Sequence, residues 1–479
     1  MVKPAAYRAI SGLGAYLPVL RLERAAAAKA LRNLGLGSRA PGRRAVAGWD
    51  EDALTLAVEA ARGPAAAMTP SRLVFASTSA PFTERSQSAL MVEALALPAA
   101  CRTLDVAGSR RCAGSALLDA LIAGQDTLIA AGETRKTQPG SATHVSYGDG
   151  AASVSVSDNG PARLIGYASH AHDFLDMYAS VDHPTPYGYE ERFIRETATP
   201  KIIAPAIMAA CESAGIEPGD IAHAAVHEPL SGMWRDIAKA CRITAPNHAA
   251  DLAVAAGDLG AAHALFALAL ALNAAKPGDK VLLVGFGSGV DALIFDVTDT
   301  VPGATEAAGM VSTGQSLDDY VRFLSLNGDL DLDWGPRSEF EQKAQATVIE
   351  RYGRDMIGFI GGRDPTGNVQ FPKSKIPIRP DADGAEALVD VRLADAPAKL
   401  ASVTADRLNF TPDPPFWFGL VQFDNGARVL MELTDANAAG FKVGDAVTMR
   451  LRIKSRDRRR GMRTYFWKAA PVSRPALEG

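Results

Sequence analysis

The sequence is poor in cysteine and has no long uninterrupted apolar run. Its 479 residues include only four cysteines, and none of them lies in a short paired motif: Cys101, Cys112, Cys211 and Cys241. That usage argues against a disulfide framework and a cysteine-rich zinc site, and it is typical of the reducing cytoplasm. No segment reads as a signal peptide or a membrane span. We therefore expect a cytoplasmic protein that does not bind membranes.

An excess of charge of one sign is also lacking. The net charge is −4 over the whole chain, so no global field attracts the protein to nucleic acid or to anionic lipid. The length exceeds what one hydrophobic core supports, which predicts two or three domains. These features together indicate a globular, multidomain, enzyme-like chain.

Up to about residue 300, short apolar runs alternate with alanine-rich helical stretches. We expect strands at 74–77, 103–107 and 127–131 and a helix at 115–122. This alternation predicts an α/β architecture with buried, mostly parallel strands.

The same order of elements then occurs a second time. Residues 127–158 and 281–297 both read as strand, glycine-rich turn and strand, and an Ala/Leu-rich helix precedes each of them. An internal duplication of roughly 150 residues follows from that repetition.

The composition changes after Thr300. Glycine, proline and acidic residues predict a connector over 301–344, and from about residue 345 the pattern becomes that of β-strands separated by turns. We expect these strands at 387–393, 398–409, 416–422, 428–433, 446–453 and 463–468. Short strands at such spacing predict a small closed barrel.

Cys112 is the first candidate for chemistry, because it opens a helical stretch directly after a strand. The free N–H groups and the dipole of a helix start stabilise a thiolate and lower its pKa, as an acyl-accepting nucleophile requires. The alternative is that Cys112 is a small buried hydrophobic residue.

Three further features could form a site with it. His227 ends an apolar strand, where it could act as general acid or base or could be structural. Asp258 opens a helix and could simply cap it. Gly287, Ser288 and Gly289 join two strands, where they could make a tight hairpin or an oxyanion hole.

A basic run at 450–468 ends in three aromatic residues. It could bind single-stranded nucleic acid, form edge strands or a domain interface, or contact the phosphates of a bound ligand. We favour the edge or interface and expect no nucleic acid. His170, His172 and Asp173 resemble metal ligands, but no further ligand is near them in sequence, so we read them as surface or pocket-lid residues.

Five segments carry a resemblance to a known family. In chain order they are LDVAGSRRCAGSALLDAL, GDGAASVSVSD, AVHEP, GDLGAAHALFALAL and GFGSG. In order and spacing they resemble the HMG-CoA synthase and ketoacyl synthase III branch of the thiolase superfamily, over roughly residues 7–300. The C-terminal part resembles the OB-fold proteins that accompany thiolases. The resemblance implies a duplicated α-β-α-β-α thiolase fold followed by a small all-β OB-fold barrel. The implied parts are 1–158 and 159–300 as thiolase halves, 301–344 as linker and 345–479 as OB-fold domain.

Several residues fall on positions of the family's active site. His227 falls on the catalytic histidine, and the loop of Gly287, Ser288 and Gly289 falls on the oxyanion loop. Asp258 stands where the family has asparagine. Thr78, an expected substrate contact, stands where HMG-CoA synthases have a catalytic glutamate. Because a hydroxyl cannot replace a carboxylate as general base, HMG-CoA synthesis itself is not expected.

The nucleophile is displaced. A gap-free alignment places Arg110 or Arg111 on the family's cysteine, with Cys112 one or two residues later. One residue on a helix turns a side chain by about 100 degrees. Two mechanisms therefore stay open: a shifted Cys112 nucleophile, or cysteine-independent chemistry in which Arg111 and His227 bind and polarise a 3-oxoacyl group.

The resemblance implies a CoA-dependent acyltransferase that acts on a carbon–carbon bond β to a carbonyl. Retro-Claisen cleavage of a 3-oxoacyl substrate is preferred, with an aromatic or branched acyl group as the guess. The alternatives are a Claisen-condensing enzyme and a non-catalytic acyl-CoA-binding subunit. CoA is expected as substrate and a homodimer as the assembly. No metal is expected, because residues 361–380 lack the cysteines of the family's zinc ribbon.

Overall fold

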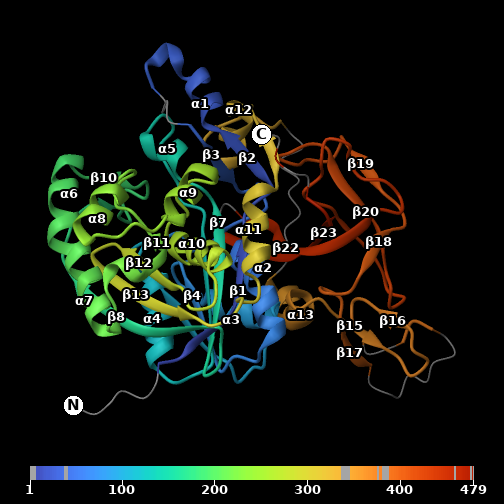
Figure 1. The fold of residues 1–479 in the computed structure, drawn as a ribbon. Helices are drawn as coiled ribbons and strands as arrows, with labels where there is room; N and C mark the ends of the chain where they lie inside the picture. The colour runs from blue at the N-terminus through green and yellow to red at the C-terminus, as the bar shows by residue number, and fades with distance from the viewer. Residues whose placement is uncertain are drawn as a thin grey trace.

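The computed structural model describes residues 7–36, 41–335, 346–374, 377–379, 388–457, 460–474 and 477. A nine-stranded sheet with helices on its faces occupies the first 300 residues, and the orange and red C-terminal strands lie beside it (Figure 1). Within the described residues, no helix is long and apolar enough to cross a membrane.

The sheet consists of two halves with the same strand order. The first half is ordered β5-β4-β6-β7-β1, and the second is ordered β11-β12-β13-β8. The first half contains β1 (Ala9–Tyr16), β4 (Arg72–Ala76), β5 (Arg102–Val106), β6 (Thr127–Glu133) and β7 (Gly150–Ser157). The second contains β8 (Ala162–Ala171), β11 (Ile221–Val226), β12 (Lys280–Phe286) and β13 (Gly289–Val297). A parallel bridge between Ala224 and Asn247 stands where the second half would have its outer strand. The repeated order agrees with the duplication that the sequence predicts.

The sheet is mixed, and the expectation of mostly parallel strands is wrong. β4 runs parallel to β5 and β6, and β11 runs parallel to β12, but the remaining pairs in the sheet are antiparallel. One cause is the two-residue connection between β12 and β13, which permits only a hairpin. Antiparallel pairing of β1 with β8 joins the two halves.

Two central helices contact strands of both halves. These are α4 (Cys112–Ile122) and α10 (Ala261–Ala274), which touch each other, β6 and β12. Because α10 is apolar all round, it can be buried on every side. On the outer faces, α2 (Ala53–Ala67) covers the first half and α7 (Ala204–Ala214) the second. The result is a layered α-β-α-β-α arrangement.

The other elements of this region lie at its periphery. The helices are α1 (Arg24–Ala30), α3 (Gln87–Ala94), α5 (Ala142–Ser146), α6 (Glu191–Ala198), α8 (Trp234–Cys241) and α9 (His248–Ala255). The strands are β2 (Leu20–Glu23), β3 (Arg43–Val46), β9 (Met177–Tyr178) and β10 (Tyr187–Gly188).

The segment that composition marks as a connector is largely structured. It contains α11 (Ala304–Ser312), β14 (Gln315–Leu317) and α12 (Tyr320–Asn327). β14 pairs with β2, and Phe323 of α12 is fully buried. Residues 336–345 lie outside the described part of the chain. The following region opens with a helix, α13 (Ala346–Ile357), which the β pattern did not predict.

The C-terminal region is largely antiparallel β-structure. Its small sheet is made of β15 (Ile360–Arg363), β16 (Val369–Gln370) and β17 (Val389–Arg392). Its larger sheet is made of β18 (Ala398–Leu400), β19 (Thr404–Asp406), β20 (Phe416–Phe423), β21 (Arg428–Glu432), β22 (Ala446–Asp457) and β23 (Met462–Pro471). The predicted strands are thus confirmed, although 398–409 splits into two. A bridge between Leu433 and Ala469 brings the end of β21 to β23, whereas closure into an OB barrel stays a prediction.

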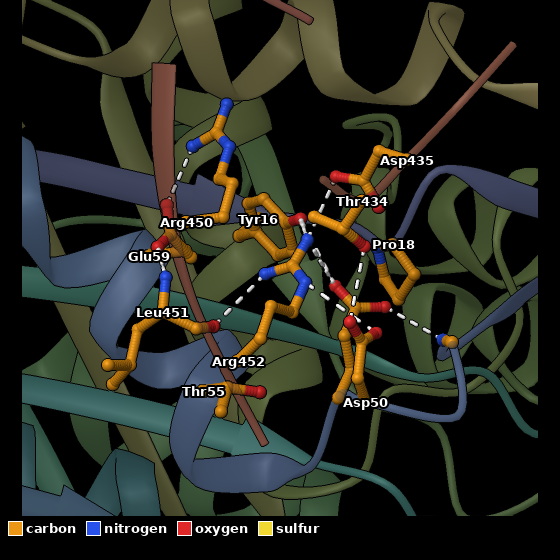
Figure 2. Close-up of polar contacts among 12 residues, drawn as sticks. Tyr16, Pro18, Asp50, Thr55, Glu59, Thr434, Asp435, Arg450, Leu451 and Arg452 are labelled. Carbon is orange, nitrogen blue, oxygen red and sulfur yellow. Dashed lines mark hydrogen bonds and ion pairs between the residues drawn. The ribbon is translucent and has the colours of Figure 1, made fainter. Parts of the chain in front are cut away.

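The basic run lies at the contact between the C-terminal strands and the start of α2, as the interface interpretation predicted. Arg458 and Arg459 of that run lie outside the described residues. Figure 2 shows Arg452 pointing among Tyr16, Asp50 and Asp435. Its Nη2 atom lies 2.9 Å from both the Tyr16 hydroxyl and the Asp435 carboxylate and 3.0 Å from Glu51.

A second buried pair stands beside it. Arg450 donates to Glu59 at 2.6 Å, and the Leu451 amide donates to the other Glu59 oxygen at 2.9 Å (Figure 2). Burial alone would raise the pKa of Glu59, but the guanidinium groups of Arg62 and Arg450 lower it to about 2. The interface therefore consists of buried charges that satisfy one another across two parts of the chain.

Removing the centre of this network should destabilise the protein strongly. Arg452→Met leaves the buried Glu51 and the half-buried Asp435 without this cation, and it leaves Asp50 paired with Lys468. We expect the change to cost about 3–5 kcal/mol. The midpoint of urea unfolding, followed by tryptophan fluorescence, measures the effect. Arg192→Ala, which removes an 88% exposed side chain, is the control and should change stability by less than about 0.5 kcal/mol. Equal midpoints for the two variants would contradict the role of Arg452.

Candidate active site

Five polar side chains converge where strand ends meet the starts of the central helices. Thr78 follows β4, Glu133 ends β6 and His227 follows β11. Arg110 precedes α4, and Asp258 precedes α10. Since the carboxyl ends of parallel strands and helix N-termini lie at one edge of such a sheet, the fold brings together residues that are up to 180 positions apart in sequence.

Asp258 and His227 form a hydrogen-bonded pair. The His227 Nε2 atom lies 3.1 Å from the Asp258 Oδ1 atom, and the histidine is only 3% exposed. Burial would raise the pKa of Asp258, but Arg135 and His227 hold it well below its ordinary value. The ionised carboxylate can only accept, so Nε2 carries the proton and donates it. In a neutral ring Nδ1 is then the basic nitrogen, and it is buried with no hydrogen-bond partner among the described residues.

A second histidine packs against His227 and stays neutral. The ring centroids of His227 and His263 lie 4.6 Å apart. His263 accepts from the Leu259 amide through Nδ1 at 3.2 Å and donates from Nε2 to the Ala249 carbonyl at 2.9 Å. Burial, together with repulsion from His227, lowers the pKa of His263 to about 3. The neutral ring therefore provides a fixed surface that holds the plane of His227.

Two arginines approach the same aspartate. Arg135 lies 3.1 Å from Oδ1 of Asp258, and it also donates to the Asp258 carbonyl at 2.7 Å. Its guanidinium lies 3.5 Å from the centroid of the Tyr147 ring. Arg110 lies 3.6 Å from Oδ2 of Asp258 and is ion-paired with Asp176. Asp258 is therefore the centre of a charged cluster and not merely a helix cap, although it also accepts from the Gly260 amide at 2.8 Å.

Glu133 is a buried carboxylate that the sequence analysis did not identify. Its Oε1 atom accepts from the amide and hydroxyl of Thr78 at 2.8 and 2.9 Å and from the Ala261 amide at 3.2 Å. The Ser79 hydroxyl donates to its other oxygen. A carboxylate thus lies beside Thr78, contributed by the neighbouring strand. The available signal was a charged residue ending the otherwise apolar run TLIAAGE.

The thiol of Cys112 is buried and has a high pKa. Cys112 is 6% exposed, and burial together with the negative charge of Glu133 raises its pKa to about 12. Amides of Ser77, Cys112 and Ala113 face the sulfur and oppose this shift, but they do not cancel it. The expectation that the helix start lowers this pKa is therefore wrong, because desolvation outweighs the helix dipole.

Cys112 also lines a cavity of about 440 Å³ between β5 and α4. Leu104, Val106 and Arg111 line the same cavity, whereas His227 and Asp258 are not among its described lining residues. The cavity that Cys112 lines is therefore distinct from the His227–Asp258 pair, although Glu133 lies near enough to the thiol to raise its pKa.

Arg111 braces the GFGSG loop. Its Nε and Nη2 atoms donate to the carbonyls of Gly287 and Ser288 at 3.2 and 3.3 Å, and Nη1 lies 3.0 Å from Asp291. The Gly287 amide donates to the Gly289 carbonyl at 3.0 Å. Arg111 is therefore occupied within the loop, and the arginine beside the His227–Asp258 pair is Arg110. The oxyanion role of the loop stays a prediction.

Gly287 is needed for the close approach of this loop to α4. Its φ is +153°, and an added Cβ would lie 3.3 Å from the amides of Arg110 and Arg111. The histidine-rich segment is separate from this site, since His170, His172 and Asp173 are exposed at the end of β8. Across the described ranges, no group of three or more His, Cys, Asp or Glu side chains could hold a metal ion.

Comparisons with known proteins agree with this architecture. Residues 211–295 match the family model of the 3-oxoacyl-[acyl-carrier-protein] synthase III C-terminal region. The hydroxymethylglutaryl-CoA synthase of Pyrobaculum arsenaticum is 31% identical over 274 residues, covering 54% of this chain and 78% of that protein. That of Caldivirga maquilingensis is 29% identical over 332 residues, covering 65% of this chain and 93% of that protein. The crystal structure of an HMG-CoA synthase complexed with CoA shares the fold, with a TM-score of 0.57, 14% identity and coverage of 69% of this chain and 92% of that one.

The state of the Cys112 thiol can be tested by alkylation. A pKa near 12 leaves about a thousandfold less thiolate at neutral pH than a thiol with the reference value of 9.0. We expect iodoacetamide to label Cys112 slowly at pH 7.5 in the native protein, with the rate rising steadily up to pH 9. Mass spectrometry of peptides locates the label, and protein unfolded in urea is the control for full reactivity. Rapid native labelling at pH 7 would contradict the high pKa.

Proposed function

The chain belongs to the hydroxymethylglutaryl-CoA synthase family, and we propose that it catalyses retro-Claisen cleavage of a 3-oxoacyl thioester by CoA. Members of this thiolase superfamily are CoA-dependent acyltransferases that form or break carbon–carbon bonds, and the chain is an acyltransferase of that type. The observation that carries the proposal is the unpartnered Nδ1 of His227, held beside an ionised Asp258.

In the proposed reaction His227 moves one proton. Its Nδ1 accepts the thiol proton of CoA, and the thiolate attacks the 3-oxo carbon of the substrate. The bond between carbons 2 and 3 breaks, and its electron pair stays on carbon 2 as an enolate. His227 returns the proton to that carbon. Two thioesters result: the attacking CoA now carries carbon 3 with the rest of the chain, and the original thioester keeps carbons 1 and 2. Atoms and charge balance without a further reactant.

The neighbouring residues support this proton transfer. Asp258 orients the imidazole and stabilises its protonated form. Arg135 keeps Asp258 ionised, so the carboxylate remains an acceptor throughout. For the oxyanion we propose the loop of Gly287, Ser288 and Gly289, positioned by Arg111. Thr78 has a less direct role, since its amide and hydroxyl are bound to Glu133.

The cysteine-independent route is favoured over the covalent one. Acylation of Cys112 would need a thiolate, and burial raises the pKa of this thiol to about 12. Arg110 lies 3.6 Å from Asp258, the hydrogen-bond partner of His227. Condensation is the second candidate direction, since the relatives are named hydroxymethylglutaryl-CoA synthases and the same groups would catalyse the reverse reaction. An aromatic or branched acyl group remains the guess for the substrate.

We also propose the organisation of the chain. The parts are two thiolase halves at 1–158 and 159–300, a linker at 301–344 and an OB-fold domain at 345–479. The Leu433–Ala469 bridge supports closure of the barrel. β5 is an edge strand whose side chains are mostly exposed, which supports a homodimer built across that edge. The unpaired cysteines support a cytoplasmic location.

The proposal is tested by product analysis and intact mass with a panel of 3-oxoacyl-CoA thioesters and free CoA. We expect turnover that falls by about 10²–10⁴-fold in His227→Ala. Cys112→Ala should retain activity within a few fold, and His170→Ala, which removes an exposed histidine, is the control. Asp258→Asn should lower turnover, because the amide cannot stabilise the protonated ring as a carboxylate does.

Each contrary result has a distinct meaning. An acyl adduct on the wild type that disappears in Cys112→Ala would establish the covalent route. Condensation without cleavage would show that the enzyme forms the carbon–carbon bond and does not break it. Absence of both turnover and adduct with every thioester would favour the remaining alternative, a non-catalytic acyl-CoA-binding subunit.

A further inference from the structure

The role of Arg110 is not accounted for by proton transfer. It is a buried arginine that contacts Asp258, the hydrogen-bond partner of His227. Its closer ionic partner comes from outside the sheet. That partner, Asp176, belongs to residues 172–190, which connect β8 to α6 and which we call the flap. The flap therefore reaches into the site through one carboxylate.

Among the described residues, Asp176 is the closer of the two carboxylates that pair with Arg110. Asp258 is already bound by Arg135 at 3.1 Å, by His227 at 3.1 Å and by the Gly260 amide at 2.8 Å. Its contact with Arg110 is longer, at 3.6 Å. Without Asp176, the carboxylate contact left to Arg110 among the described residues is the longer one with Asp258, which Arg135 and His227 already bind. Because an unpaired buried cation is strongly unfavourable, an anion must occupy that place.

The flap is held to the rest of the protein by few contacts. Asp176 pairs with Arg110, and Met177 contacts the Tyr147 hydroxyl. At the two ends of the flap, the buried Phe174 ring packs on Phe286 and Phe193, and Tyr189 packs on Phe193. Among the strands that the structure describes, β9 and β10 pair only with each other. Val181 is 98% exposed, and other large flap side chains are exposed as well: Leu175, Tyr178, Tyr187 and Tyr189. The Asp176 carboxylate can therefore leave Arg110 without disrupting the core.

The anion that replaces Asp176 must lie on the acyl group. Arg110 and His227 both contact Asp258, so the guanidinium is close to the reacting atoms. The phosphates of CoA are separated from its sulfur by the long pantetheine arm, and they cannot reach Arg110 while the thiol is at His227. A carboxylate matches the planar guanidinium in two parallel hydrogen bonds.

We propose that Arg110 selects a 3-oxoacyl thioester whose acyl chain ends in a carboxylate, and that Asp176 occupies the carboxylate position when substrate is absent. This inference rests on the proposed function, which supplies the 3-oxoacyl thioester as the substrate class. It adds the class of acyl group and names Arg110 as the residue that recognises it. A methyl-ended chain leaves Asp176 on Arg110, so the flap stays in place over the site.

The first test compares substrates of equal length that end in a carboxylate or in a methyl group. We expect kcat/KM to favour the carboxylate by at least about 100-fold in the wild type, because a site built for a charged group rejects an analogue that lacks it. Arg110→Met should abolish that preference. Equal kcat/KM values for the two wild-type reactions would overturn the inference while leaving the cleavage reaction intact.

The second test uses equilibrium binding and does not depend on turnover. Saturated acyl-CoA thioesters lack the 3-oxo group and cannot be cleaved, so calorimetry with carboxylate-ended and methyl-ended forms measures recognition alone. We expect the wild type to bind the carboxylate-ended thioester at least about tenfold more tightly than the methyl-ended one. In Arg110→Met the two thioesters should bind equally. This preference without any turnover of 3-oxoacyl thioesters would support recognition by Arg110 and contradict the proposed reaction.

Asp176→Asn gives a result of opposite sign. Removing the internal competitor should tighten binding of the carboxylate-ended thioester several-fold and leave the methyl-ended one unchanged. Asp173→Asn, an exposed aspartate of the same flap, is the matched control and should change neither value. Thermal unfolding checks that each variant is folded. Weaker carboxylate binding in folded Asp176→Asn would show that Asp176 supports the ligand instead of competing with it, and would overturn the inference.

Discussion

The site depends on the ionised carboxylate of Asp258. It accepts a hydrogen bond from His227 and therefore sets the tautomer of that histidine. It also forms ion pairs with Arg135 and Arg110. An asparagine at this position could hydrogen-bond to the histidine but could not attract two guanidinium groups. The carboxylate of Asp258 and the cation of Arg110 are therefore physically linked, since each charge compensates the other in a buried place.

A similar compensation joins the two parts of the chain. Arg452 is fully buried, and it bridges Glu51 and Tyr16 of the sheet region to Asp435 of the C-terminal strands (Figure 2). Burial would lower the pKa of such an arginine, but the surrounding carboxylates raise it well above its ordinary value. Because these charges are satisfied only across the contact, the C-terminal strands are held in one orientation on α2. Arg450 and Arg452 of the basic run thus join the two parts of this protein.

The active-site motifs were easier to locate than to interpret. His227 and Asp258 were found because each follows or precedes a strongly apolar element, and the structure brings them within hydrogen-bonding distance. The role of Arg111 was harder to assign, because the sequence could not tell which of two adjacent arginines turns toward the histidine. Glu133 was missed, since a single acidic residue at a strand end has no distinguishing pattern. The pKa of Cys112 was predicted in the wrong direction, because burial of a helix start cannot be read from local sequence.

The sequence by itself determined the alternation of strands and helices, the duplication and the change to β-structure after residue 345, because these depend on local periodicity and on turn residues. It also determined where the candidate residues stand relative to strand ends. Only the tertiary structure decided which charges meet. The pairing of Arg110 with Asp176, of Glu133 with Thr78 and of Arg452 with Glu51 joins residues far apart in the chain. Such contacts are set by the packing of whole elements, and desolvation then decides which of the paired groups is charged.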